Sequence, residues 1–340
     1  MKKNIDKSNL RRVILSTADQ FKEGVAIAKD ININVQFSRV MVSGMGGSAL
    51  HANVLRIILN DTAKKYNHYR VTSVYQNRFY KLPPEAYNDC LNIICSHSGN
   101  TEETIASFEE ALENNLPCIG ISSGGIIKDM CKKNNVPHIK LPIPFENFQP
   151  RMATGHFVSS ILQVLVNAKK LPKEIVEMDE ISEQLRDATL QMEERGKRIA
   201  EILVGKTPII YASTKFKALA MIWKIKINEN AKTPAFWNYF PELNHNEFVG
   251  FSNPQAQFHI LMLRDLKDYS RNLLRYKLTA KFLEKKGIKT EIIDMPEGNI
   301  LYRAFATITL ADWISYYLAL EYKQDPTPVD MVEELKKALK

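Results

Sequence analysis

The sequence predicts an α/β protein made of two similar halves, each a doubly wound parallel sheet flanked by helices. Short apolar runs typical of buried strands alternate with segments of helical periodicity through most of the 340 residues. The strand and turn at 40–48 and the unit at 92–121 have counterparts at 208–216 and 259–294. Such alternation indicates a parallel sheet that is covered by helices on both faces.

The first half is expected to open with a helix over residues 8–28 and then to hold five strands. The expected strands cover residues 40–43, 71–75, 91–95, 118–123 and 137–141. The expected helices between and after them cover residues 49–59, 102–114, 126–133 and 156–168. Pro142, Pro144 and Pro150 interrupt the alternation before the last of these helices.

The second half repeats the plan without the glycines of the first. Its expected strands cover residues 208–213, 258–263 and 290–295, and its expected helices cover 216–230, 271–286, 299–323 and 329–339. The stretch at 170–205 is charged and helical, which is typical of a connector. We therefore expect an N-terminal subdomain over 1–170, a helical connector over 171–205 and a C-terminal subdomain over 206–340.

The composition is typical of a globular protein that binds a small anion. Apolar residues make up 45% of the chain, and the formal net charge is +8. No dense basic block with interleaved aromatic residues occurs, so we expect no nucleic-acid partner. No signal peptide or membrane-spanning run is recognisable, which favours the cytoplasm and no membrane partner. The four cysteines lack the spacing of a zinc site.

A glycine-rich turn, Gly44-Met45-Gly46-Gly47-Ser48, joins the first strand to a helix. A turn of this kind leaves N–H groups of the helix start free to bind an anion, most often a phosphate. Gly47 permits close backbone approach, and Ser48 adds a hydroxyl. The turn matches neither the dinucleotide fingerprint nor the Walker A loop. A tight turn without any ligand is the alternative.

A second polar turn, Ser96-His97-Ser98-Gly99-Asn100-Thr101, follows the third expected strand. The carboxyl ends of strands in an open α/β sheet are where ligands bind. Ser96, Ser98 and Thr101 offer three hydroxyls for a phosphate, whereas a helix-capping turn is the alternative interpretation. Together with Gly47 and Ser48, these residues predict one phosphate site formed by two converging turns.

These two turns resemble those of the sugar isomerase (SIS) domain, a doubly wound, flavodoxin-like fold. Three further segments narrow the resemblance to the bifunctional phosphoglucose/phosphomannose isomerase family over about residues 36–340. They are Asn228-Glu229-Asn230-Ala231-Lys232, Pro241-Glu242-Leu243-Asn244-His245-Asn246 and Asp325-Pro326-Thr327-Pro328, with Arg151 after Pro150.

The resemblance implies a role for each of four residues outside the phosphate site. Glu229 is the base that moves a proton between two sugar carbons, and His245 opens the sugar ring from the partner subunit of a homodimer. Arg151 holds the substrate and stabilises an enediolate. Lys336 assists ring opening, although Lys337 is the neighbouring candidate. Taken singly, each of these residues would otherwise be interpreted as an ordinary surface side chain.

The resemblance thus implies an aldose–ketose isomerase that interconverts glucose 6-phosphate, and mannose 6-phosphate as well, with fructose 6-phosphate through a cis-enediol. No metal and no other cofactor are expected. Mannose 6-phosphate activity is linked in the family to a threonine, for which Thr327 is the local candidate, whereas Val329 lies nearer the matching position. The alternatives are a non-catalytic SIS regulator, an isomerase of another sugar phosphate and, more distantly, a nucleotide-dependent dehydrogenase.

Overall fold

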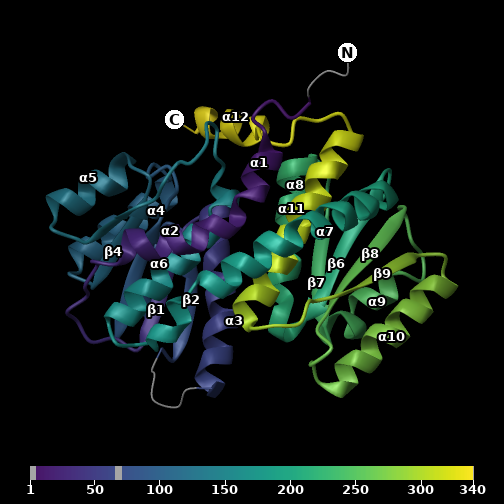
Figure 1. The fold of residues 1–340 in the computed structure, drawn as a ribbon, viewed down its shortest axis with the longest axis horizontal. Coiled ribbons are helices and arrows are strands. Elements are labelled where there is room, and N and C mark those ends of the chain that lie inside the picture. Colours follow the sequence, from purple (N-terminus) through teal and green to yellow (C-terminus); the bar gives the residue numbers. More distant parts are fainter. Residues whose placement is uncertain (1–4, 66–70, 340) are drawn as a thin grey trace. The chain divides into compact units, whose positions relative to one another are not determined.

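The computed structural model describes residues 5–65 and 71–339, and the chain divides into two compact units (Figure 1). We call Ser16–Arg186 the N-terminal unit, and Met1–Leu15 together with Asp187–Lys340 the C-terminal unit. The chain thus divides after Leu15 and after Arg186, whereas the sequence predicts boundaries near residues 170 and 205. The division into two subdomains and a connector at those residues stays a prediction.

The sheet of the N-terminal unit has five parallel strands in the order β2-β1-β3-β4-β5. The strands are β1 (Arg39–Ser43), β2 (Ser73–Asn77), β3 (Cys90–Cys95), β4 (Cys118–Ser122) and β5 (His138–Lys140). This is the flavodoxin-like order, in which the chain changes direction across the sheet between β1 and β3. All six residues of β3 are buried, because helices cover both faces of a central parallel strand.

The sheet of the C-terminal unit repeats that order with one strand fewer, as β7-β6-β8-β9. The strands are β6 (Thr207–Ser213), β7 (Phe236–Phe240), β8 (Phe258–Arg264) and β9 (Lys289–Asp294), and all neighbouring pairs are parallel. The predicted α/β class with two doubly wound parallel sheets is therefore confirmed.

Helices flank both sheets. Those of the N-terminal unit are α2 (Gln20–Ala28), α3 (Leu50–Lys65), α4 (Glu102–Glu113), α5 (Gly125–Lys133) and α6 (Thr154–Asn167). Those of the C-terminal unit are α1 (Leu10–Leu15), α8 (Lys217–Ala231), α9 (Glu247–Gly250), α10 (Ser270–Lys285), α11 (Ile300–Glu321) and α12 (Asp330–Ala338). The long helix α7 (Asp179–Leu203) runs from one unit into the other.

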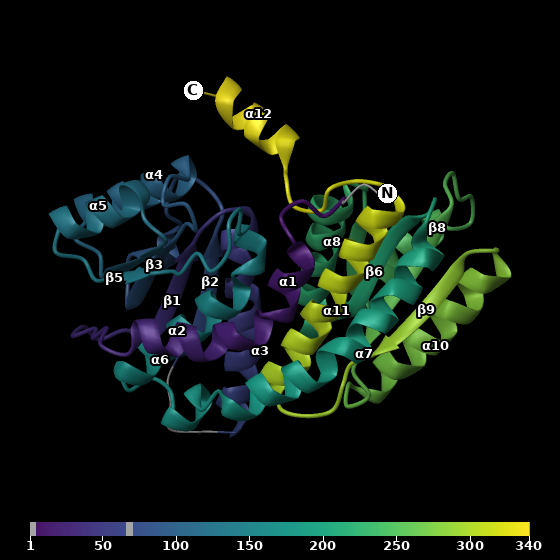
Figure 2. The same ribbon diagram turned by 45° about the horizontal axis from the view of Figure 1, so that its top comes forward.

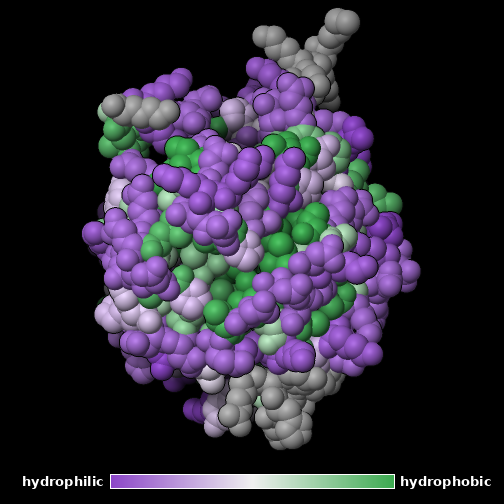
Figure 3. Space-filling model, turned by 90° about the vertical axis from the view of Figure 1, so that its left-hand side faces the viewer, coloured by the Kyte–Doolittle hydropathy of each residue, from purple (hydrophilic) through white to green (hydrophobic). Residues whose placement is uncertain are grey.

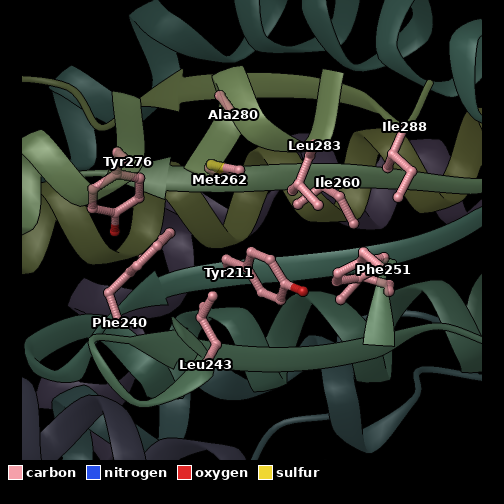
Figure 4. Packing of buried hydrophobic residues seen from close by; sticks show 11 residues of the cluster. Tyr211, Phe240, Leu243, Phe251, Ile260, Met262, Tyr276, Ala280, Leu283 and Ile288 are labelled. Carbon is pink, nitrogen blue, oxygen red and sulfur yellow. The ribbon is translucent and has the colours of Figure 1, made fainter. Parts of the chain in front are cut away.

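The sheet of the C-terminal unit has α8 and α11 on one face and α10 on the other (Figure 2). Side chains of β6, β8, α10 and the segment after β7 fill the space under α10, and they form one apolar cluster (Figure 4). Tyr211, Phe240, Phe251 and Tyr276 supply its buried aromatic rings. Helix α11 is buried along most of its length, which explains why its sequence is apolar on every side.

The structure differs from the sequence-based expectation at three elements. The helix expected over 8–28 is broken near Ser16, and its two parts, α1 and α2, belong to different units. Strand β2 begins at Ser73, two residues later than expected. Strand β7, with the sequence Phe236-Trp237-Asn238-Tyr239-Phe240, is not among the expected strands. Its aromatic residues favour a strand, and the repeat of the first half calls for one after α8.

Apolar side chains also lie on the surface, as on the face shown in Figure 3, where they gather among hydrophilic ones. Among the described residues, no helix is long and apolar enough to span a membrane. All four cysteines are unpaired. Burial raises the pKa of both Cys90 and Cys118 to about 11, so these two thiols are in the unreactive, protonated form at neutral pH.

Candidate active site

The two polar turns of the N-terminal unit meet where the sheet changes direction. The short 3₁₀ helix Gly46–Ala49 follows β1 and leads into α3. Its Ser48 Oγ accepts a hydrogen bond of 2.9 Å from the backbone N–H of His97, in the turn after β3. A Cβ atom on Gly44 would lie 2.8 Å from the carbonyl oxygen of Cys95, so only glycine allows this approach.

The hydroxyls of the turn after β3 form one connected group. Ser96 Oγ lies 2.8 Å from Thr101 Oγ1 and 3.5 Å from Ser98 Oγ. The backbone N–H of Gly99 donates to Ser96 Oγ at 3.0 Å. Thr101 precedes α4 but makes no side-chain capping bond, because its hydroxyl turns to Ser96 instead. The simple capping interpretation of Thr101 therefore does not describe this turn.

Arg151 lies against the first turn. The 3₁₀ helix Pro150–Met152 packs on Gly46–Ala49, and a Cβ atom on Gly47 would lie 2.4 Å from the backbone nitrogen of Arg151. The Arg151 side chain is buried, and its Nη1 donates to Gln149 Oε1 at 3.3 Å. The structure thus brings Arg151 together with Gly47 and Ser48, which are about a hundred residues away in the sequence.

This arrangement can bind an anion. Helices α3 and α4 begin at the two turns, and the first N–H groups of a helix together with its dipole attract negative charge. The hydroxyls of Ser48, Ser96, Ser98 and Thr101 add neutral donors, and Arg151 adds a buried positive charge. Sites of this composition, at the switch point of a doubly wound sheet, suit a phosphate group.

Two buried histidines border this region and remain neutral in the folded protein. Burial lowers the pKa of His97 to about 4, with a further contribution from nearby His156. Burial and, secondarily, Arg78 lower the pKa of His51 to about 3. The His51 ring stacks on Phe157, with 4.3 Å between ring centroids. Neither histidine is therefore a source of positive charge for the anion site at neutral pH.

Because the pKa values of these two histidines are low, we expect acid to destabilise the protein. In the unfolded chain the imidazoles of His51 and His97 take up protons below about pH 6.5. In the folded chain they stay neutral down to about pH 4 or lower, so the free energy of unfolding decreases as the pH falls from 6.5. Each such histidine contributes a slope of about 1.4 kcal/mol per pH unit in that range. Urea unfolding at pH 7, 6 and 5 measures this slope. In the variant His51→Phe the slope should decrease by the contribution of one histidine. An unchanged slope would contradict the low pKa of His51 in the folded protein.

Glu229 lies near the end of α8 in the C-terminal unit, where its neighbours hold the backbone. Asn228 Nδ2 donates to the carbonyl of Thr233 at 2.9 Å, and Asn230 Nδ2 donates to Ser315 Oγ of α11 at 2.9 Å. Lys232 adopts a left-handed conformation that ends the helix, and its Nζ donates to the Glu229 carbonyl at 2.9 Å. The two asparagines thus have structural roles, and Glu229 is the half-buried carboxylate between them.

His245 ends the 3₁₀ helix Glu242–His245 after β7, and its side chain is exposed. The residues beside it are anchored. Asn244 Nδ2 donates to Thr279 Oγ1 of α10 at 2.9 Å. The Glu247 carboxylate accepts hydrogen bonds of 2.5 Å from Tyr211 and from Asn238 Nδ2. The fold therefore presents His245 outward on a fixed segment.

The C-terminal candidates lie on or before the exposed helix α12. Lys336 Nζ pairs with Glu333 Oε1 at 2.6 Å on the solvent-facing side of the helix, and Lys337 is exposed as well. Thr327 is buried, and its backbone N–H donates to Asp325 Oδ1 at 3.1 Å. Among the residues described, no group of three or more His, Cys, Asp or Glu side chains is placed to hold a metal ion.

Sequence reasoning missed two sets of supporting residues. One is the anchor of the His245 segment, in which Tyr211 and Asn238 hold Glu247. The other is the buried ion pair between Lys226 of α8 and Asp312 of α11, with 2.6 Å between Nζ and Oδ1. A lysine inside the apolar run of α8, one turn before Glu229, is the only sequence signal for the second set.

Comparison with known proteins identifies the family. A bifunctional phosphoglucose/phosphomannose isomerase of Caldicellulosiruptor bescii is 33% identical over 342 residues, which cover 96% of this chain and 97% of the relative. The chain belongs to the bifunctional phosphoglucose/phosphomannose isomerase family. The family member from Aquifex aeolicus is likewise 33% identical, over 97% of this chain and 98% of its own length. Residues 192–339 match the model of the bacterial phosphoglucose isomerase C-terminal SIS domain.

A more distant relative and several solved structures extend the comparison. A D-glucosamine-6-phosphate 4-epimerase of Sulfolobus acidocaldarius is 29% identical over 68% of this chain and 70% of its own length. The C-terminal domain of a glucosamine-fructose-6-phosphate aminotransferase from Francisella tularensis superposes with a TM-score of 0.72 at 14% identity, covering 95% of this chain and 98% of that chain. A putative phosphosugar isomerase from Clostridium difficile superposes with a TM-score of 0.71 at 12% identity, covering 94% and 95%. These superpositions show that this chain shares its overall fold with both structures.

Proposed function

We propose that this chain interconverts glucose 6-phosphate and mannose 6-phosphate with fructose 6-phosphate. The observation that carries the proposal is the full-length match, at one third identity, to members of the bifunctional phosphoglucose/phosphomannose isomerase family. Membership makes the chain an enzyme of the isomerase class, an aldose–ketose isomerase of sugar phosphates. The convergent turns of the N-terminal unit support the proposal, because they suit the phosphate group that all these sugars share.

In this proposal the N-terminal unit holds the substrate by its phosphate. Gly47 and Ser48 contribute the first turn, and Ser96, Ser98 and Thr101 contribute the second. Neutral N–H and hydroxyl donors suit this task, because they bind a phosphate dianion without being titrated near neutral pH. Arg151 lies next to Ser48 and stabilises negative charge that develops on the sugar oxygens during the reaction.

The proposed reaction proceeds in two stages. His245, assisted by Lys336, moves a proton between O1 and the ring oxygen, which opens the pyranose ring and frees the C1 carbonyl. The Glu229 carboxylate then takes the proton from C2, forming a cis-enediol, and returns it to C1 to give the ketose. Proton return to the opposite face of C2 would give mannose 6-phosphate, so one base serves both aldoses.

The proposed catalytic unit is a homodimer in which His245 reaches the site of the partner subunit. Its exposure on an anchored segment supports this role, because an exposed imidazole on a rigid support can enter a neighbouring molecule. The proposed location is the cytoplasm, where thiols are kept reduced, in line with the four unpaired cysteines.

A coupled assay of the purified protein tests the function. Glucose 6-phosphate and mannose 6-phosphate are each expected to be converted to fructose 6-phosphate, in the presence of a chelator as well as without it. Turnover of glucose 6-phosphate alone would restrict the proposal to one sugar. Because one relative is named a D-glucosamine-6-phosphate 4-epimerase, glucosamine 6-phosphate is assayed as a third substrate. Turnover of that sugar only, or of none by folded protein, would contradict the proposed function.

A further inference from the structure

The C-terminal unit repeats the elements that surround the two polar turns of the N-terminal unit. In each unit the first strand, β1 or β6, ends in a serine and leads through a short 3₁₀ helix into a longer helix, α3 or α8. A later helix, α6 in one unit and α11 in the other, packs on that helix. The carboxyl edge of the second sheet is therefore the counterpart of the edge that carries the polar turns.

An arginine near the start of that later helix lies at the turn after the first strand in both units. Arg151 precedes α6 and packs against the 3₁₀ helix Gly46–Ala49. Arg303 lies in the first turn of α11, and its guanidinium carbon is 5.5 Å from the ring centroid of Phe216, in the 3₁₀ helix after β6. Both arginines are buried. The two units therefore share a buried arginine beside this turn.

The units differ in the residue that follows the neighbouring strand. Ser96 is the first residue after β3, whereas Asp265 is the first residue after β8. Only 2% of the Asp265 side chain is exposed. A serine hydroxyl in this position can donate to a bound anion, but a carboxylate is itself an anion. Once buried, it needs cations and N–H donors of the kind that a bound phosphate needs.

Donors from three segments hold Asp265. Its Oδ1 lies 2.5 Å from Nη2 of Arg303 and accepts a hydrogen bond of 2.9 Å from the backbone N–H of Lys267. Its Oδ2 lies 3.9 Å from Nζ of Lys215, in the 3₁₀ helix after β6. In the described part of the chain Oδ2 accepts no hydrogen bond. A guanidinium, a main-chain N–H and an ammonium group thus surround one carboxylate, and proteins bind phosphate with the same three groups.

The two cations make an anion necessary at this place. The Arg303 side chain is only 8% exposed, and a buried guanidinium without a counter-charge is strongly destabilising. The Lys215 side chain is 37% exposed, and its Nζ lies 4.9 Å from the ring centroid of Phe216. An anion from solvent could therefore enter beside Lys215 if Asp265 did not occupy the place.

We propose that the C-terminal unit contains a second phosphate site of the same design as the first, and that Asp265 keeps it closed by filling it with its own carboxylate. The native chain then binds one phosphate group, at the turns of the N-terminal unit, and not two. The donors of the closed site instead tie α11 and the turn after β6 to the end of β8. The comparison of the two units rests on the proposed function of the N-terminal turns.

The variant Asp265→Ser is expected to open the closed site, because it places after β8 the type of residue that follows β3. Equilibrium dialysis with radiolabelled inorganic phosphate counts the phosphates bound to each chain. We expect one for the wild type and two for Asp265→Ser. The matched control is Asp265→Ser combined with Arg303→Met, which has the same serine but no guanidinium, and it should bind one.

Thermal unfolding gives a second measurement, which also serves if Asp265→Ser is unstable. In chloride buffer this variant should melt at a lower temperature than the wild type, since Arg303 has lost its counter-charge. Saturating phosphate should raise its melting temperature by about 3–5 °C more than that of the wild type. The control with Arg303→Met should show only the rise of the wild type.

Three results would overturn the closed site. They are a wild type that binds two phosphates, a variant Asp265→Ser that gains none in either measurement, and a control with Arg303→Met that gains as much as Asp265→Ser does. The last of these would identify adventitious binding of an ion to a basic protein.

The closed site and the proposed function can fail separately. If the wild type binds no phosphate and Asp265→Ser binds one, the N-terminal turns are not a phosphate site, whereas the closed site stands. If the wild type binds one phosphate and isomerises sugar phosphates, but Asp265→Ser gains none, the proposed function stands and the closed site fails.

Discussion

Replacing Glu229 with glutamine is expected to lower the turnover of glucose 6-phosphate by about 10²- to 10⁴-fold, the usual contribution of a general base. The amide has the size of the carboxylate but cannot accept the C2 proton. The backbone around it is held by Asn228, Asn230 and Lys232, so the fold should be unaffected. Steady-state kinetics measure the loss in kcat, and calorimetric titration with substrate should show nearly unchanged affinity.

The matched control is Glu201→Gln, an exposed glutamate of α7 that takes no part in the proposed site. It should have wild-type kinetics. A Glu229→Gln enzyme that retains its kcat would remove Glu229 as the base. A loss of binding rather than of turnover would assign Glu229 to substrate recognition instead.

Replacing Gly47 with alanine is expected to raise the KM for every sugar phosphate by about tenfold or more. A displacement of binding groups by about 1 Å is enough to weaken substrate binding and catalysis by at least this factor. The added Cβ would meet the backbone nitrogen of Arg151 at 2.4 Å and the carbonyl carbon of Pro150 at 2.8 Å. Both are main-chain atoms and cannot rotate away, so the two 3₁₀ helices must move apart. The separation displaces both Ser48 and Arg151. Overpacking of this kind also lowers the free energy of unfolding by about 1–3 kcal/mol.

The control for this substitution is Gly250→Ala, because a Cβ atom there would have no neighbour within 4 Å and the backbone is not left-handed. KM and the affinity for inorganic phosphate should change only in Gly47→Ala. An alanine variant that binds phosphate as the wild type does would show that the first turn is not part of the phosphate site.

The two polar turns could be predicted from the sequence because their position follows from local order. Each polar turn comes directly after a buried strand, and the carboxyl ends of parallel strands lie at one edge of the sheet. The predicted meeting of the Ser48 turn with the Ser96 turn is confirmed by the bond from the His97 N–H to Ser48 Oγ. The role of these turns in binding phosphate stays a prediction.

Other features depend on contacts between distant segments. Periodicity continues through Ser16, so it could not reveal that the first expected helix is broken there. Gln20, just after the break, is fixed by hydrogen bonds to Met152 and Gly155 of a segment 130 residues later. The anchoring of His245 through Glu247, Tyr211 and Asn238 likewise needs the folded sheet. Strand β7 could have been found, since the repeat of the first half requires it.

Isomerisation in D₂O, followed by proton NMR, tests the central claim most directly. If Glu229 moves a proton through a cis-enediol, the protonated carboxyl exchanges with D₂O in some of the turnovers. Glucose 6-phosphate and fructose 6-phosphate kept at equilibrium by the wild type should therefore accumulate solvent deuterium at C2 of glucose 6-phosphate. Glu229→Gln should neither isomerise the sugar nor exchange that hydrogen. Glucose 6-phosphate that stays free of deuterium at C2 after many passages through the enediol, or exchange that persists in Glu229→Gln, would contradict the proposed mechanism.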